Sequence, residues 1–167
     1  MKSGPEWRGG YIVREKIGDF QICSFDALTT HELYEMMRAR ADVFMGEEKI
    51  LYPDADGIDY DSIHVFRTDS DGRVIAYLRM FRKADEPGTI QMGRVLTREH
   101  GQGLGHKLLE AAMQGAAQFM GAREVYLESQ KHAEGFYMKS GFTAASGEFM
   151  EAGIPHVQMR RRLDTPG

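Results

Sequence analysis

The feature that most constrains this sequence is a glycine-rich turn between a predicted strand and a predicted helix. A run with strand character over 89–97 is followed by alternate glycines at 101–105, and apolar residues then recur at helical spacing over 108–119. Glycine reaches backbone conformations that other residues avoid, so several N–H groups can converge on one point. At a helix start these donors are unpaired, and the helix dipole favours negative charge. The turn is therefore predicted to bind a phosphate.

The spacing of these glycines fits neither of two common phosphate loops. A dinucleotide fingerprint requires G-x-G-x-x-G, and a nucleotide-triphosphate loop requires G-x-x-x-x-G-K-[ST]. His106 and Leu108 stand where those motifs require Gly and Ser or Thr.

Two motifs in the chain resemble the GNAT superfamily of acyl-CoA N-acyltransferases. The turn reads His100-Gly-Gln-Gly103-Leu-Gly105, which is similar to the superfamily's pyrophosphate loop, R/Q-x-x-G-x-G/A. Further along, the superfamily's helix motif N-x-x-A-x-x-x-Y-x-K-x-G-F is similar to Gln130-Lys-His-Ala133-Glu-Gly-Phe-Tyr137-Met-Lys-Ser-Gly141-Phe142. The two motifs occur in the expected order and separation, and they depart from the family pattern at His100 and Gln130.

Within this superfamily the resemblance is closest to the ElaA-like branch. The front motif of that branch is similar to Arg40-Ala-Asp-Val43-Phe44-Met-Gly-Glu47 followed by Tyr52 and Asp56, and its tail motif is similar to Gly153-Ile-Pro-His156.

The order of the predicted elements favours a mixed α/β fold rather than a helix bundle or a β-sandwich. Strands are expected around 20–22, over 62–68, 73–82, 89–97 and 124–130, and on both sides of Ala152-Gly153. Helices are expected from a capping box at Thr29 and Glu32 to about Met45, after the glycine turn, and from Lys131 to Gly141. Residues 1–18 are interpreted as a loose extension, in which a strand over 11–17 is allowed, and residues 19–167 as a single domain. The resemblance implies a mostly antiparallel sheet whose central strands, 89–97 and 124–130, splay apart between flanking helices.

Composition is that of an ordinary globular protein. The chain has 167 residues, a net charge of −4 and 42% hydrophobic residues, without the basic excess that indicates a nucleic-acid partner. A single cysteine, Cys23, excludes an intrachain disulfide, and no apolar run is long enough for a signal peptide or a membrane span, so a cytoplasmic location is expected. The six histidines include no metal-binding motif, and the acidic run over 54–61 lacks the last ligand of a calcium loop, so no metal is expected.

The resemblance implies where an acyl-CoA would bind. Its pyrophosphate would lie on N–H groups of the glycine turn and its pantetheine arm along strand 89–97. The thioester carbonyl would lie near Val95 and Leu96, where a backbone N–H would stabilise the oxyanion. The residues expected to contact acetyl-CoA, the expected donor, are Val95, Leu96, Thr97, His100, Gly101, Gln102, Gly103, Leu104, Gly105, His106 and Gln130.

Acyl transfer to an amine requires two proton transfers. An amine with a pKa of about 10 must lose a proton, and the departing CoA thiolate must gain one. Tyr137, matched to the family's tyrosine, is predicted to be the general acid, with simple packing, which Phe136 can also supply, as the alternative. Glu47, in the ElaA-like front motif, is the first choice for the base. The other candidates are Glu128, His64 and His156. Whether the two histidines meet depends on the fold.

The acidic run over 54–61 is interpreted as a loop that faces the acceptor and attracts a cationic amine, with a solvated turn as the alternative. Residues expected to contact the acceptor are Arg40, Tyr52, Asp56, His64, Arg94 and His156. Met45, Met92 and Met138 are candidates to line the same pocket.

The sequence thus predicts an N-acetyltransferase that moves acetyl from acetyl-CoA to a primary amine of a small molecule or peptide by direct attack. Neither nucleic acid nor a membrane is expected as a partner, and a homodimer is allowed. Two alternatives stay open. One is acyl-homoserine-lactone synthesis, because Arg40-x-x-Val43-Phe44, Asp56, Asp59 and Arg79 also resemble that family, and the other is a module that binds acyl-CoA without turnover.

Overall fold

The structure, a computed structural model, describes residues 12–49 and 53–163. In these residues nine strands form one sheet in the order β1-β2-β3-β4-β5-β6-β9-β7, with β8 paired to β9. The strands are β1 (Arg14–Ile17), β2 (Phe20–Ser24), β3 (Ile63–Thr68), β4 (Val74–Arg82), β5 (Thr89–Thr97), β6 (Glu124–Gln130), β7 (Thr143–Ala144), β8 (Phe149–Glu151) and β9 (Ile154–Arg162). The helices are α1 (Thr30–Arg40), α2 (Leu104–Met120) and α3 (Glu134–Lys139), with a π-helical segment (Ala41–Glu47) directly after α1 and short 3-10 turns at Phe25–Ala27, Ile58–Asp61 and Lys131–Ala133.

Neighbouring strands are antiparallel throughout the described sheet except for β5 and β6, which are parallel. The predicted mixed α/β fold with a mostly antiparallel sheet is therefore confirmed.

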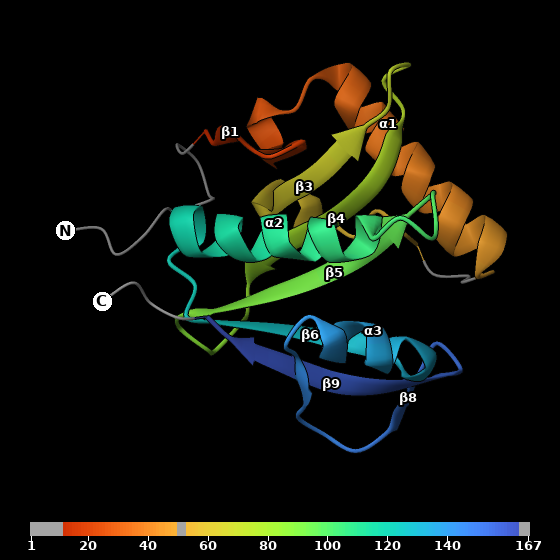
Figure 1. Cartoon of the computed structure of the whole chain (residues 1–167), viewed down its shortest axis with the longest axis vertical. Coiled ribbons are helices and arrows are strands. Elements are labelled where there is room, and N and C mark those ends of the chain that lie inside the picture. The colour runs from red at the N-terminus through yellow and green to blue at the C-terminus, as the bar shows by residue number, and fades with distance from the viewer. Residues whose placement is uncertain (1–11, 50–52, 164–167) are drawn as a thin grey trace.

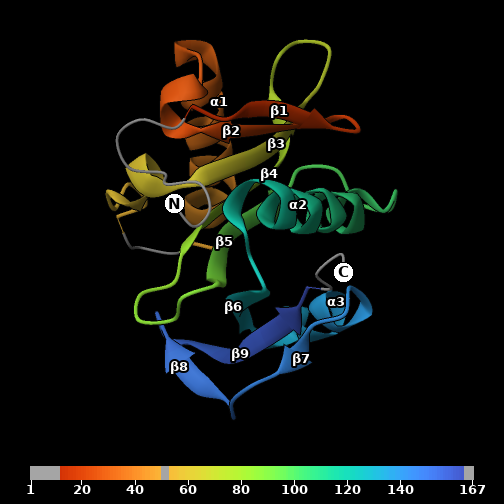
Figure 2. The same cartoon turned by 90° about the vertical axis from the view of Figure 1, so that its left-hand side faces the viewer.

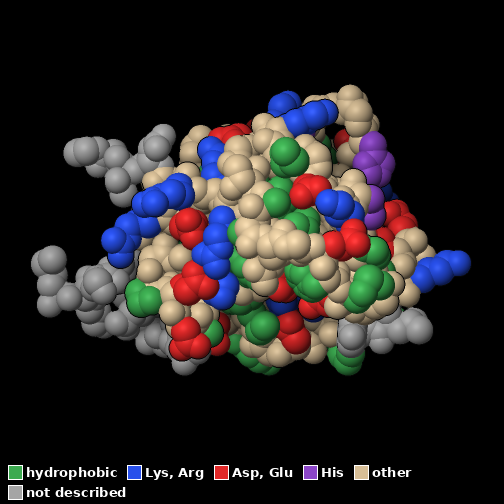
Figure 3. Space-filling model, turned by 90° about the horizontal axis from the view of Figure 1, so that it is seen from below, with side chains coloured by type: hydrophobic (Ala, Val, Ile, Leu, Met, Phe, Trp, Pro, Cys, Tyr) green, Lys and Arg blue, Asp and Glu red, His purple; other side chains and the backbone are tan. Residues whose placement is uncertain are grey.

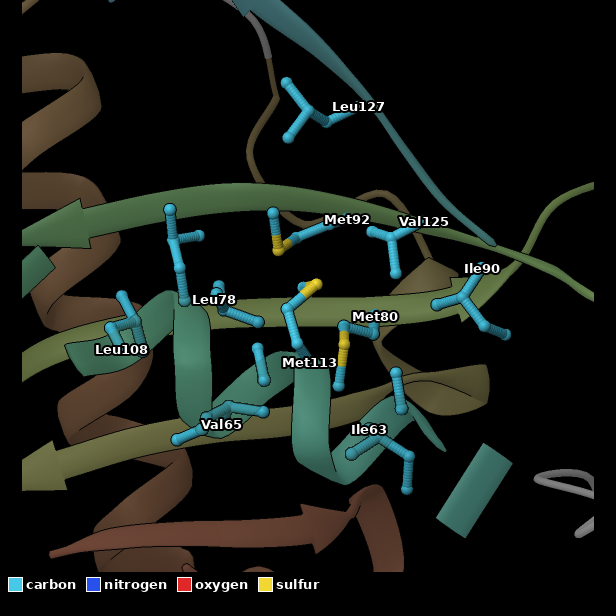
Figure 4. Packing of buried hydrophobic residues seen from close by; sticks show 14 of the residues in the cluster. Ile63, Val65, Leu78, Met80, Ile90, Met92, Leu108, Met113, Val125 and Leu127 are labelled. Atoms are coloured by element: carbon cyan, nitrogen blue, oxygen red, sulfur yellow. The ribbon is translucent and has the colours of Figure 1, made fainter. Parts of the chain in front are cut away.

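Helices α1 and α2 cover opposite faces of the half of the sheet formed by β1–β5, and α3 covers the half formed by β6 and β9 (Figures 1 and 2). Strand β4 is buried on both faces because its side chains alternate between the two layers. Leu78 and Met80 pack in the cluster that contains Leu108 and Met113 of α2 (Figure 4), whereas Tyr77 packs in the α1 cluster. These two hydrophobic clusters hold α1 and α2 on the sheet.

The local signals in the sequence produce the expected structure. The Thr29 hydroxyl accepts a bond from the Glu32 N–H, and the Glu32 carboxylate accepts one from the Thr29 N–H, which completes the predicted capping box at the start of α1. The β3–β4 hairpin turns at Gly72, whose φ is +80°, and the β8–β9 hairpin turns at Ala152 and Gly153, whose φ values are +56° and +73°.

Three elements differ from the prediction or extend it. The strand that the sequence allowed over 11–17 is present as β1, which pairs with β2 at one edge of the sheet. The helix predicted to end near Met45 continues to Glu47, its last part in π-helical form. The two-residue strand β7 was not predicted, because a pairing this short has no hydrophobic period of its own.

The parallel pairing of β5 with β6 is short. It joins Thr89–Gln91 to Glu124–Tyr126, and beyond these residues the strands diverge (Figure 1). The divergence confirms the splayed central strands, and it divides the sheet into two halves with a wedge between them.

Charged side chains on the face seen in Figure 3 are mixed in sign, with basic and acidic groups side by side. Arg160 pairs with Glu86 and Glu124, and Arg161 pairs with Glu110. Two of the three consecutive arginines at 160–162 are thus paired with carboxylates. Among the described residues no helix is long and apolar enough to cross a membrane.

Candidate active site

A cavity of about 990 Å³ opens where β5 and β6 diverge. Its walls come from the end of the first helical segment, the loop after Pro53, β5, the glycine turn, β6, α3 and the β8–β9 turn. The sequence-predicted residues that line it are Asp56, Arg94, Val95, Leu96, Thr97, His100, Gly101, Gly103, Leu104, Gly105, His106, Glu128, Gln130, Tyr137 and His156, together with Met45 and Met92. The structure therefore brings the separate sequence motifs to one cavity.

The glycine turn leaves the start of α2 open to an anion. Gly101 and Gly103 have φ values of +87° and +71°, which only glycine adopts readily, and Gly103 is the residue at which the helix begins. None of the side chains that the structure describes caps this end of α2, and its first turn contains no acidic residue. The first N–H groups of the helix can therefore donate to a ligand. The side chain of Gln102, in contrast, is exposed and does not line the cavity.

Helix α3 packs directly on this turn. The Phe136 ring lies 4.6 Å from the His106 ring, centroid to centroid, and His106 Nδ1 lies 2.9 Å from Ser140 Oγ. His106 therefore joins the start of α2 to the end of α3 and has one ring nitrogen engaged in that contact.

Strand β5 contains a β-bulge at the cavity wall. Arg79 pairs with Gly93 and Tyr77 pairs with Leu96, so Arg94 and Val95 together face a single residue of β4. Arg94 has a φ of +54°, which is unusual for a residue with a side chain. A bulge interrupts the ladder and leaves its extra residue unpaired. Unpaired backbone groups thus lie where the family resemblance places the thioester carbonyl.

The acidic loop is held by arginines. Asp54 Oδ1 accepts a bond from Arg94 Nε at 2.9 Å, and the Asp56 carboxylate accepts two bonds from Arg79, at 2.6 and 2.8 Å. Burial would raise the pKa of Asp56, but the hydrogen bonds from Arg79 outweigh it and hold the pKa at about 2. Asp54 and Asp56 line the cavity, but their carboxylates are already paired with arginines.

Arg40 and His64 lie beneath this loop and do not line the cavity, which corrects their prediction as acceptor contacts. Arg40 is fully buried and donates to Asp59 Oδ1 at 2.7 Å and to the Asp54 carbonyl at 3.1 Å. His64 Nε2 donates to the Asp59 carbonyl at 3.0 Å, because a carbonyl can only accept, and its Nδ1 therefore accepts from the Tyr77 hydroxyl at 2.7 Å. Burial lowers the pKa of His64 to about 4.

This buried network also contains the residues that resemble acyl-homoserine-lactone synthases. Arg40, Asp56, Asp59 and Arg79 bond to one another or to adjacent backbone. Their role visible in the structure is to hold the loop on the sheet.

The two candidate histidines do not meet, because strands β4, β5 and β6 separate His64 on β3 from His156 on β9. His156 lines the cavity, and its Nδ1 donates to the Ile154 carbonyl at 2.7 Å. Met138 is exposed and does not line the cavity, whereas Tyr52 lies outside the described residues.

Tyr137 belongs both to the core and to the cavity wall. Its ring is 8% exposed and packs edge-on against Phe136 and Phe142, with centroid distances of 5.1 and 5.9 Å. Its hydroxyl makes no hydrogen bond with the part of the chain that the structure describes. Burial and, secondly, the charge of Glu48 raise the pKa of Tyr137, so the phenol keeps its proton at neutral pH.

Glu48, which the sequence analysis did not select, faces the cavity in place of Glu47. Glu47 is exposed and does not line the cavity, so the structure does not support it as the base. Glu48 is half-buried, lines the cavity, and accepts a bond of 2.6 Å from Gln130 Nε2. Glu48 faces the cavity because of the π-helical segment that precedes it, and no pattern in the sequence predicts that segment.

The sequence of residues 55–163 matches the family model described as acetyltransferase (GNAT) domain, which covers more than half of the chain. The chain belongs to the GNAT family of acyl-CoA N-acyltransferases. It is 34% identical over 148 residues to a UPF0039 protein of Schizosaccharomyces pombe, a match that covers 87% of this chain and 97% of the relative. An acyl-CoA N-acyltransferase from Pseudomonas aeruginosa has a similar structure, with a TM-score of 0.78, 37% identity and coverage of 86% and 98% of the two chains.

The predicted ElaA-like branch is confirmed as well. Escherichia coli ElaA is 28% identical in its crystal structure, with a TM-score of 0.79 and coverage of 90% of this GNAT chain and all of ElaA.

The cavity of this GNAT protein fits an acyl-CoA. The uncapped start of α2 offers N–H donors to a pyrophosphate, and the bulged edge of β5 offers unpaired backbone groups to an extended pantetheine arm. The cavity volume of about 990 Å³ lies at the upper end of the range for small-molecule sites.

Proposed function

We propose that this protein transfers an acetyl group from acetyl-CoA to a primary amine, of a small molecule or a peptide, by direct attack in a ternary complex. The observation that carries the proposal is that an uncapped helix start, the bulge of β5 and the Tyr137 ring all line one cavity. The family description, an acetyltransferase domain, supports acetyl as the transferred group.

The residues of the glycine turn hold the donor by its phosphates, because no side chain within 12–49 and 53–163 caps the N–H groups at the start of α2. Val95 and Leu96 flank the thioester, where a backbone N–H of the bulge stabilises the oxyanion that forms as the amine attacks. In other acyl-transfer sites the loss of one such donor costs about 3–4 kcal/mol of transition-state stabilisation.

Tyr137 supplies the proton for the departing thiolate. Its phenol is protonated before reaction because burial raises its pKa. The same burial disfavours a thiolate in the cavity, so the pKa of the thiol that forms there is raised as well. Because both pKa values are raised, proton transfer from the phenol to sulfur is less unfavourable than it would be if only the pKa of Tyr137 were raised.

The test is release of CoA thiol from acetyl-CoA across a panel of primary amines, with calorimetric titration of CoA in parallel. Thiol release that depends on an amine supports the transferase and identifies the class of acceptor. Tight CoA binding without release on any amine or lysine peptide argues for a binding module instead, and an absence of CoA binding contradicts the assignment of the glycine turn.

A further inference from the structure

Glu48 connects the two walls of the wedge. It follows the π-helical segment on the β1–β5 side, where its own N–H donates to the Val43 carbonyl at 2.9 Å. Gln130 ends β6 on the other side, and its Nε2 donates to Glu48 Oε1 at 2.6 Å. The hydrogen bond therefore joins the two sides of the wedge through residues that are 82 positions apart.

The direction of this hydrogen bond is fixed by chemistry. An ionised carboxylate only accepts, so the amide NH₂ of Gln130 must face Glu48 and its oxygen must face the other way. That oxygen lies 2.6 Å from His132 Nε2, which must therefore carry a proton and donate it. His132 orients Gln130, and Gln130 in turn holds one oxygen of Glu48.

Glu48 differs from three other carboxylates on the cavity wall, those of Asp54, Asp56 and Glu128. Asp54 and Asp56 are paired with arginines, and Glu128 accepts a bond from the Tyr126 hydroxyl at 3.0 Å. Glu48 Oε2 has no hydrogen bond from the described residues, and Glu48 is the group whose charge acts on Tyr137. A carboxylate oxygen without a partner among the described residues thus lines the same cavity as the phenol that the proposed reaction uses as its acid.

We propose that Glu48 is the general base that takes the proton from the acceptor amine, and that Gln130 and His132 are positioning residues that aim its carboxylate into the cavity. This inference rests on the proposed function. It replaces the sequence-based choice of Glu47, and it gives Gln130 a role other than contact with the cofactor.

The proton balance of this arrangement closes within the site. As the nitrogen of the neutral amine bonds to the thioester carbon, its N–H becomes acidic and one proton passes to Glu48. The C–S bond then breaks, sulfur takes the Tyr137 proton, and Glu48 returns its proton to the phenolate. The products are the amide and the CoA thiol. Burial is the main cause of the raised pKa of Tyr137, and the charge of Glu48 adds to it. Protonation of Glu48 removes this second contribution, so the phenol becomes a better acid when the thiolate leaves.

The experiment compares Glu48→Gln with Glu47→Gln on the amine that the wild-type protein acetylates best. Both variants remove one negative charge, but only position 48 lines the cavity. General base catalysis contributes about 10²–10⁴-fold, so we expect kcat to fall by at least about 100-fold in Glu48→Gln and by less than about twofold in Glu47→Gln. The Kd for CoA, measured by calorimetry, and the thermal midpoint should stay unchanged in both.

The positioning residues are tested by measuring kcat and the Kd for CoA separately in each variant. Gln130→Ala should lower kcat while the Kd for CoA is unchanged, and His132→Gln, whose amide can also donate to Gln130, should restore most of the kcat that His132→Ala loses. A raised Kd for CoA with unchanged kcat in Gln130→Ala would overturn the positioning role in favour of a cofactor contact.

Two further outcomes separate this inference from the function on which it rests. If the wild-type protein acetylates amines and Glu48→Gln is as active, the base assignment is wrong and the transferase stands. If the wild-type protein releases no thiol with any amine, the proposed function fails and the base assignment with it.

Discussion

The Phe136 ring lies so close to Gly105 that a β-carbon at position 105 would come within 2.9 Å of two of the ring's carbon atoms. Gly105 has an ordinary helical φ, unlike Gly101 and Gly103, which have positive φ values. The last glycine of the turn is therefore required for the close approach of α3 to α2, not for an unusual backbone conformation.

Gly105→Ala should lower the free energy of unfolding by about 1–3 kcal/mol, because the added methyl group overpacks the contact with Phe136. It should also weaken CoA binding, since the turn must shift. Gly135→Ala is the matched control, because a β-carbon there meets nothing within 4 Å, and it should leave stability unchanged or raise it slightly. Urea unfolding and CoA calorimetry on both variants make the comparison, and equal stabilities would contradict the packing argument.

Tyr137→Phe should lower kcat by about 100-fold, within the range for loss of a general acid, and leave the Kd for CoA nearly unchanged. The ring packs against Phe136 and Phe142 through its edges, and phenylalanine retains those contacts. Steady-state kinetics with a saturating amine and calorimetry with CoA measure the two quantities. Wild-type turnover in this variant would leave Tyr137 with a packing role only.

His64 should make the protein less stable as the pH falls from about 6.5 to about 4. Its folded-state pKa is lowered to about 4, so the unfolded state binds more protons within that window. The stabilisation is complete above pH 6.5 and is lost as the pH falls, and it amounts to roughly 3 kcal/mol at 1.36 kcal/mol per pKa unit. Urea unfolding at intervals across this window, on the wild type and on His64→Gln, should give a steeper slope in the wild type, because carboxylates with lowered pKa values such as Glu86 contribute equally to both proteins. A parallel slope in both would assign the pH dependence to other groups.

Arg40→Ala should destabilise the fold by about 3–5 kcal/mol without a specific loss of acceptor affinity, because it leaves the buried Asp59 carboxylate without its closest partner. Arg38→Ala is the control on the same helix. Arg38 is half-exposed and its contact with Glu35 is 3.4 Å long, so its removal should cost less than about 1 kcal/mol. Denaturant unfolding measures the stabilities. A raised KM for the amine with unchanged stability in Arg40→Ala would restore the sequence-based assignment to the substrate.

Part of the site could be predicted because its determinants are local. Conformational freedom at Gly101 and Gly103, and the helix start that follows them, are properties of adjacent residues, and the structure places them where expected. The capping box at Thr29 and the turn at Gly72 could be predicted for the same reason.

Glu48 could not be found in this way. In an α-helix, Glu47 and Glu48 would lie on either side of the face that carries Phe44, and the ElaA-like motif favours the first of them. The π-helical segment has wider i→i+5 turns, so each turn takes more residues and the phase of the side chains shifts. Glu48 then comes to the cavity and Glu47 to the surface.

The sequence by itself determined the fold class, the family and the glycine turn before α2, because hydrophobic period, turn chemistry and motif spacing act over short distances along the chain. The tertiary structure alone decided which charges are free to act. Arg40, His64 and Asp56 look available in the sequence, yet burial and pairing across α1, the acidic loop and β4 commit them to one another. Desolvation and ion pairing depend on what surrounds a side chain in space, and the linear order of residues does not specify that.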